Sequence, residues 1–123
     1  MILVDTSVWV DHFRAASPDL MRLLEQGRVL IHPFVVGELA LGNLRDRPLV
    51  LGTLRQMPQA VRAHDDEVQS FIETNRLHGL GVGYVDAQLL ASVRLTAGAR
   101  FWTRDQRLNA VGEALSVAFH PEA

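Results

Sequence analysis

The sequence contains no cysteine and no lysine. Without cysteine the chain cannot form disulfides, thiolate metal sites or a cysteine nucleophile, and this composition suits a reducing cytoplasm. Without lysine, every mechanism that requires a lysine amine is excluded. The 12 basic residues are therefore all arginine, whose guanidinium can bind a phosphate through two hydrogen bonds.

Long apolar runs are also missing. No stretch approaches the roughly 20 apolar residues of a membrane span, and the N-terminus lacks the basic stretch of a secretory signal and carries Asp5. We therefore expect a soluble, cytoplasmic protein that does not enter a membrane. The 123 residues show no repeat and no linker, which predicts one domain over 1–123. The net charge of −2 neither favours nor excludes a nucleic-acid partner.

Short apolar segments alternate with helical patterns along the chain. The clearest helix signal is SPDLMRLLEQG, in which Ser17 can cap the start, Pro18 opens the first turn and Gly27 ends it. Similar signals predict helices over 6–14, 17–27, 33–42, 47–57, 65–79, 84–97 and 105–115, and strands over 1–5, 28–32, 99–103 and 116–120. This alternation indicates an α/β fold in which helices cover both faces of a parallel sheet.

Two acidic residues follow predicted strands. Asp5 comes directly after the apolar ILV, and Asp105 comes shortly after FWT. In parallel sheets, sites lie beyond the carboxyl ends of the strands, so both positions suit a functional site. Either residue alone also fits a helix N-cap.

Two further acidic residues share a helix face with apolar side chains. Glu38 and Asp86 each have apolar residues three and four positions away, which predicts that both point inward from their helices. The apolar residues are Phe34, Val35 and Leu41 for Glu38, and Leu89, Leu90 and Val93 for Asp86. Taken alone, Asp86 also fits a first-turn acid stabilised by the helix dipole, and Glu38 fits a partner of an arginine.

Converging carboxylates repel one another and raise one another's pKa unless a cation lies between them. Arginine or histidine could partner some of the four acids, but a divalent ion suits a cluster better. An all-oxygen set of ligands selects Mg²⁺ or Mn²⁺ over zinc. The sequence therefore predicts an acidic metal site formed by Asp5, Glu38, Asp86 and Asp105.

These four acidic residues lie in motifs that resemble a known family. In order and spacing, DTSVW at 5–9, GEL at 37–39, YVDAQLLA at 84–91 and WTRDQRL at 102–108 resemble the PIN-domain nucleases, and most closely the VapC-type toxins of bacterial toxin–antitoxin pairs. The resemblance covers essentially the whole chain. It implies an α/β/α sandwich around a central parallel sheet of four to five strands. It also implies an endoribonuclease that depends on Mg²⁺ or Mn²⁺, with the four acidic residues as its catalytic and metal-binding groups.

The resemblance suggests roles for polar neighbours of the acids. Thr6, Ser7 and Thr103 match hydroxyl positions that orient ligands or water. Arg104 and Arg107 lie next to the site and are candidates for phosphate contacts, although ordinary surface arginines are an equal alternative. Many relatives carry a further acid shortly after the last aspartate, where this chain has QRL at 106–108. Whether one or two ions bind therefore stays open.

Partners are implied in the same way: an RNA substrate, a VapB-type antitoxin whose C-terminal segment wraps the toxin and blocks its site, and a second copy in a homodimer. The segment 44–57 carries more apolar side chains than one face of a short helix needs. A partner groove, a dimer surface and the core are all compatible with this excess, and the core is the simplest interpretation.

Other classes match the motifs less well. An adhesion-type metal-binding module begins with D-x-S-x-S, but the third position here is Trp9. A haloacid-dehalogenase-like phosphotransferase needs a second aspartate where Ser7 stands, and it uses a lysine, as does a phosphoreceiver domain. A PIN fold without catalysis, acting only through protein contacts, remains an alternative.

Overall fold

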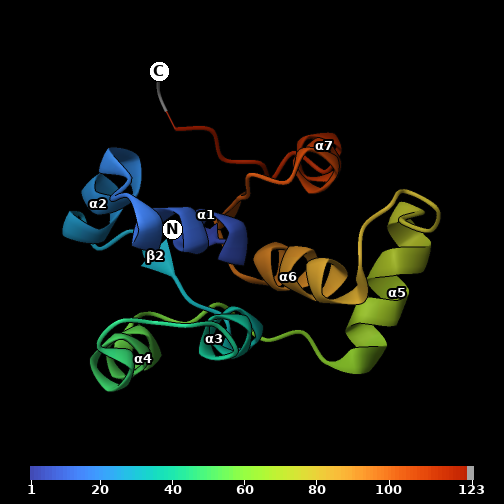
Figure 1. Ribbon diagram of the computed structural model, residues 1–123. Helices are drawn as coiled ribbons and strands as arrows, with labels where there is room; N and C mark the ends of the chain where they lie inside the picture. Colours follow the sequence, from blue (N-terminus) through green and yellow to red (C-terminus); the bar gives the residue numbers. More distant parts are fainter. Residues whose placement is uncertain (122–123) are drawn as a thin grey trace.

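The computed structural model describes residues 1–121, in which a short parallel sheet is flanked by helices (Figure 1). The elements follow in the order β1 (Ile2–Val4), α1 (Thr6–Arg14), α2 (Pro18–Glu25), β2 (Val29–Leu30), α3 (Pro33–Ala40), α4 (Arg47–Gln56), α5 (Asp65–Asn75), α6 (Tyr84–Leu95), β3 (Arg100–Trp102) and α7 (Gln106–Ala114). The α/β architecture predicted from the sequence is confirmed. Within the described residues, no helix is long and apolar enough to cross a membrane.

The strand order is β2-β1-β3, with β1 parallel to both neighbours. Leu3 in β1 pairs with Leu30 on one side and Phe101 on the other. β1 is therefore the central strand, and its three residues are all buried. Because the strands are parallel, their carboxyl ends meet at one edge of the sheet, where the chain enters α1, α3 and α7.

The prediction of four to five strands was wrong for the described part of the chain, which contains three. Segment 116–120 makes a single bridge, Phe101 to Ala118, and the opposite edge of the sheet makes another, Ile31 to Gln59. Prolines stop the Ile31–Gln59 ladder on both sides and the Phe101–Ala118 ladder on the side of Pro121, whereas toward residue 116 the amide of Val117 donates to Gly112 instead. Pro33, Pro58 and Pro121 occupy positions whose backbone N–H would form the next hydrogen bond, and proline has none.

The predicted end of the helix over 65–79 is also wrong, because α5 ends at Asn75. Arg76 adopts a left-handed backbone with φ of 53°. The amide of Leu77 then donates to the carbonyl of Ile72 (3.0 Å), and the Leu77 side chain is buried. Burial of this leucine ends the helix before Gly79, the residue that the sequence favoured as the stop signal.

Most of the apolar excess in 44–57 belongs to the core. Leu51 and Leu54 in α4 are buried, whereas Leu49 is 70% exposed. The half-buried side chains that pack against the core are Leu44, Val50 and Met57. Figure 1 shows α4 beside α3, and α5 along the outer side of α6. The core interpretation is therefore confirmed for most of this segment.

Candidate active site

Asp5 lies where β1 leaves the core, and its side chain is held by two hydroxyl groups. The Asp5 amide donates to the carbonyl of Trp102 (2.9 Å), which joins the ends of β1 and β3. Asp5 Oδ2 accepts hydrogen bonds from Ser7 Oγ (2.8 Å) and Thr103 Oγ1 (2.7 Å). Asp5 occupies the N-cap position of α1, but its side chain makes no capping hydrogen bond. Two donors on one oxygen instead fix the orientation of this buried carboxylate.

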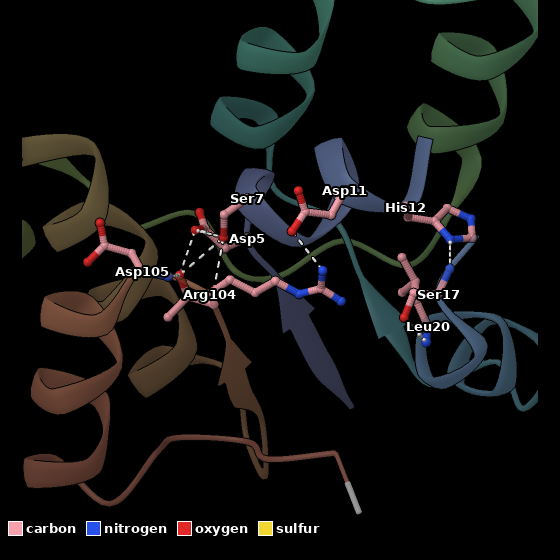
Figure 2. Close-up of polar contacts among 9 residues, drawn as sticks. Asp5, Ser7, Asp11, His12, Ser17, Leu20, Arg104 and Asp105 are labelled. Atoms are coloured by element: carbon pink, nitrogen blue, oxygen red, sulfur yellow. Dashed lines mark hydrogen bonds and ion pairs between the residues drawn. The ribbon is translucent and has the colours of Figure 1, made fainter. Parts of the chain in front are cut away.

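The same hydroxyls connect Asp5 to the loop after β3. Thr103 Oγ1 accepts from the amide of Asp105 (3.1 Å), and Ser7 Oγ accepts from the amide of Arg104 (3.1 Å). Asp105 is exposed and caps α7, since its Oδ1 accepts from the amide of Leu108 (2.9 Å). Figure 2 shows Asp5, Ser7 and Asp105 close together at the ends of the strands.

Asp86 enters the site from the first turn of α6. Its Oδ2 accepts a hydrogen bond from the amide of Gly83 (3.0 Å). Burial raises the pKa of Asp86, the Gly83 hydrogen bond lowers it, and the negative charges of Asp5 and Asp105 raise it further. The carboxylates of Asp5, Asp86 and Asp105 are thus electrostatic neighbours, although Asp5 is far from the other two in the sequence.

Glu38 was predicted to point inward, and this was wrong, because its side chain is exposed. The buried face of α3 instead carries Val35, Val36 and Leu39. Leu41, which was expected to share the face of Glu38, is 91% exposed. Glu38 faces α1, where its Oε1 accepts a hydrogen bond from Thr6 Oγ1 (2.6 Å).

Arginine does not neutralise the four acids. Among residues 1–121, the ion pairs are Arg22–Asp19, Arg104–Asp11 and His120–Glu113, and none includes a site acid. Arg104 Nη1 lies 2.7 Å from Asp11 Oδ2 (Figure 2), a contact that sequence reasoning missed, because Asp11 had no motif to mark it. The guanidinium of Arg107 lies against the backbone of Gly81, in the loop that leads into α6.

The chemistry of these donors fits a hard divalent cation, because all of them are oxygens and no arginine or histidine of the described residues forms an ion pair with them. As the side chains are oriented, no three acidic or histidine side chains in residues 1–121 are close enough together to hold one ion. One ion would therefore have to draw the carboxylates together. Asp105 and Glu38 are exposed and have room to turn, but each would first have to release its present donor, the amide of Leu108 or the hydroxyl of Thr6.

The comparisons with known proteins agree with the sequence motifs. The family model of the PIN domain matches residues 2–114. Ribonuclease VapC32 of Mycobacterium tuberculosis, from strain CDC 1551 / Oshkosh and from strain ATCC 25618 / H37Rv, is 48% identical over 122 residues, covering 99% of this chain and 98% of the relative.

Two solved structures share the fold. The crystal structure of FitAcB from Neisseria gonorrhoeae has a TM-score of 0.66 at 20% identity and covers 98% of each chain. The structure of FitAB bound to an IR36 DNA fragment has a TM-score of 0.60 at 18% identity, covering 98% of this chain and 95% of the other.

Proposed function

Because this chain belongs to the PIN-domain family, and within it to the VapC-type ribonucleases, we propose that its acidic site hydrolyses RNA as the toxin of a toxin–antitoxin pair. The observation that carries the proposal is the proximity of Asp5, Asp86 and Asp105 near the carboxyl ends of the strands, where the first and last raise the pKa of Asp86 and no arginine of residues 1–121 forms an ion pair with any of them. Repulsion between neighbouring carboxylates lowers the stability of the folded protein unless a cation binds between them.

The four acids divide two tasks in this mechanism. Asp5, Asp86 and Asp105 would hold Mg²⁺ or Mn²⁺, and Glu38 would complete the site or orient the attacking water. A divalent ion held there would supply a bound water of lowered pKa and stabilise charge on the phosphate. Attack in line with the leaving oxygen leaves a 5′-phosphate and a 3′-hydroxyl.

The hydroxyl groups keep the carboxylates in place. Ser7 and Thr103 both donate to Asp5, and Thr103 also accepts from the amide of Asp105. Thr6 holds Glu38 from the first turn of α1. These bonds fix Asp5 before the ion binds, so that the remaining rearrangement would fall on the other carboxylates, and a fixed first ligand favours both affinity and rate.

The two arginines next to the site have different starting positions for phosphate binding. The guanidinium of Arg107 lies against Gly81, in the loop that leads into the helix of Asp86. Arg104 reaches away to Asp11, so it contacts a phosphate only after leaving that carboxylate. Both arginines contact RNA in this proposal, and in the free protein Arg104 is paired with Asp11 instead.

An antitoxin segment has a suitable surface beside Glu38. A hollow between α1 and the end of α3 is bordered by Val10, Phe13, Glu38 and Leu44, and Val10 and Phe13 are exposed. An apolar segment of the antitoxin that fills this hollow would also cover Glu38 and block the site. Assembly as a homodimer and a cytoplasmic location complete the proposal.

The structure argues against an adhesion-type metal-binding module. Such a module needs a hydroxyl ligand at position 9, and Trp9 is buried at 3% exposure. A PIN fold without catalysis would give no reason for three carboxylates without an arginine partner to lie near one another, because their repulsion lowers stability.

The test is cleavage of a broad RNA pool, including transfer and ribosomal RNA, with Mg²⁺ or Mn²⁺, followed by sequencing of the new 5′ ends. Asp86→Asn should abolish the cuts, while Asp66→Asn, the same change on the exposed start of α5, should leave them unchanged. Absence of metal-dependent cleavage by the wild type, or full cleavage by Asp86→Asn, would refute the proposal.

A further inference from the structure

Helix α6, which carries Asp86, is surrounded by the protein on almost every side. Residues 87–93 are seven consecutive buried positions, which cover nearly two turns. An ordinary surface helix buries one stripe, and that stripe fixes how the helix is rotated about its axis. Because α6 is apolar around most of its circumference, apolar burial alone does not select one rotation over another.

Three fully buried polar side chains interrupt this apolar environment: His32, Gln88 and Ser92. His32 follows β2 and caps α3, where its Nδ1 accepts a hydrogen bond from the amide of Phe34 (3.0 Å). A backbone amide can only donate, so the proton of the neutral ring is on Nε2. Nε2 lies 3.0 Å from Ser92 Oγ and donates to it.

The remaining hydrogen bonds close the network. Ser92 Oγ donates to Gln88 Oε1 (2.8 Å) and accepts from the amide of Ala63 (3.2 Å). Gln88 Nε2 donates to the carbonyl of Ala63 (3.0 Å). Burial and the charge of Arg62 lower the pKa of His32, against the opposing effect of the Gln88 hydrogen bond, which agrees with a neutral ring. The network therefore joins α6 to the start of α3 and to the segment before α5.

The geometry of the helix connects this network to the acidic site. Gln88 and Ser92 are four residues apart and lie on the same face of α6. At 3.6 residues per turn, Asp86 points about 200° away from Gln88, to the opposite side of the helix. Holding Gln88 and Ser92 toward His32 and Ala63 thus turns Asp86 toward the ends of β1 and β3.

We propose that His32, Gln88 and Ser92 are positioning residues, which set the rotation of α6 and so direct Asp86 toward Asp5 and Asp105. A buried polar network suits this task because its hydrogen bonds are satisfied in one arrangement only, whereas apolar contacts tolerate several. The proposal rests on the proposed function, since the residue that it positions is a metal ligand there.

The experiment compares two buried serines. Ser92→Ala removes the hydroxyl at the centre of the network, whereas Ser17→Ala removes a buried hydroxyl that caps α2 by accepting from the amide of Leu20 (3.3 Å; Figure 2). Both changes should lower the melting temperature of the metal-free protein, because each leaves a backbone amide without its partner. Calorimetric titration with Mn²⁺, well below both melting temperatures, should show binding weakened about tenfold by Ser92→Ala only.

A second variant, His32→Asn, tests the network if Ser92→Ala does not fold. In His32→Asn, the shorter side chain can still cap α3, because asparagine is a good N-cap, but it cannot reach Ser92. The same loss of Mn²⁺ affinity is expected, and excess Mn²⁺ should restore RNA cleavage in both network variants but not in Asp86→Asn.

Mn²⁺ affinity equal to wild type in the folded network variants would overturn the inference and leave the network a purely stabilising role. Equal weakening by Ser17→Ala would overturn it as well. A wild-type protein that neither binds Mn²⁺ nor cuts RNA would instead refute the proposed function itself, and the inference with it.

Discussion

Replacing Asp11 with asparagine should strengthen RNA binding, because Asp11 competes with phosphate for Arg104. The two side chains form an ion pair of 2.7 Å, and they are 43% and 42% exposed. An ion pair this open to water contributes at most about 1 kcal/mol to stability. Asp11→Asn should therefore lower the free energy of unfolding by no more than that amount.

The same energy sets the scale of the kinetic effect. Releasing up to about 1 kcal/mol to RNA binding corresponds to a decrease in KM of roughly twofold to fivefold. The value of kcat should stay the same, because Asp11 contacts none of the four acidic residues in the described structure. Arg104→Gln should do the opposite, raising KM and reducing the salt dependence of binding by about 0.7 in the slope of log K against log salt for single-stranded RNA.

A matched control separates this effect from a general change in charge. Asp19 forms the other aspartate–arginine pair found in residues 1–121, with Arg22 on α2 at 3.1 Å. Asp19→Asn makes the same change in net charge and should leave KM almost unchanged at physiological salt, where exposed charges act over about 8 Å. Steady-state cleavage of a defined oligonucleotide at several salt concentrations measures all three variants. An unchanged or higher KM for Asp11→Asn, or an equal decrease for Asp19→Asn, would refute the reasoning.

Three further predictions concern the site. Asp86→Asn should stabilise the metal-free protein at pH 7 by about 1 kcal/mol at most, since the side chain is partly exposed. Because the pKa of Asp86 is raised in the folded protein, the wild-type free energy of unfolding decreases as pH rises through that pKa, and thermal unfolding from pH 4 to 7 should show this decrease in the wild type and not in the variant. Thr103→Val removes the hydrogen bond to Asp5 and leaves the Asp105 amide without an acceptor, so chemical denaturation should show a free energy of unfolding lower by about 1–2 kcal/mol. Calorimetry should show weaker Mn²⁺ binding, and an unchanged affinity would contradict the orienting role of Thr103. Gly81→Ala places a methyl group 2.8 Å from Arg107 Nη1 at a φ of +80°, so it should lower the free energy of unfolding by about 1–2 kcal/mol. Because the methyl group displaces Arg107, the KM for RNA should rise, and a wild-type KM would argue against Arg107 as a phosphate contact.

Parts of the fold could be predicted because their signals are local. Ser17 and Pro18 mark the start of α2 with short-range chemistry, and the apolar residues before Asp5 mark the central strand. The lengths of the edge strands could not be predicted from such signals. They depend on which residue faces which across the sheet, and only the observed register shows that Pro33, Pro58 and Pro121 fall on hydrogen-bonding positions.

Parts of the candidate site could likewise be predicted from the sequence, and other parts could not. The order of parallel strands brings Asp5 and Asp105 to one edge, so topology alone was enough to place them together. Glu38 was placed wrongly because α3 carries apolar residues on more than one face, and periodicity could not distinguish Leu41, which is exposed, from Leu39, which is buried. The contact of Arg104 with Asp11 depends on two flexible side chains on separate elements, for which the sequence holds no signal.

The orientation of Asp86 is the least local property of the site. Its apolar neighbours Leu89, Leu90 and Val93 are buried as predicted, but burial all around α6 leaves the rotation of the helix undetermined. The determining contact comes from His32, which is 56 residues from Gln88 in the sequence. Gln88 and Ser92, four positions apart in an otherwise apolar helix, were the available signal, since buried polar side chains at that spacing need a common partner. An acidic residue can therefore be predicted from its own motif, whereas its direction depends on the opposite face of its helix.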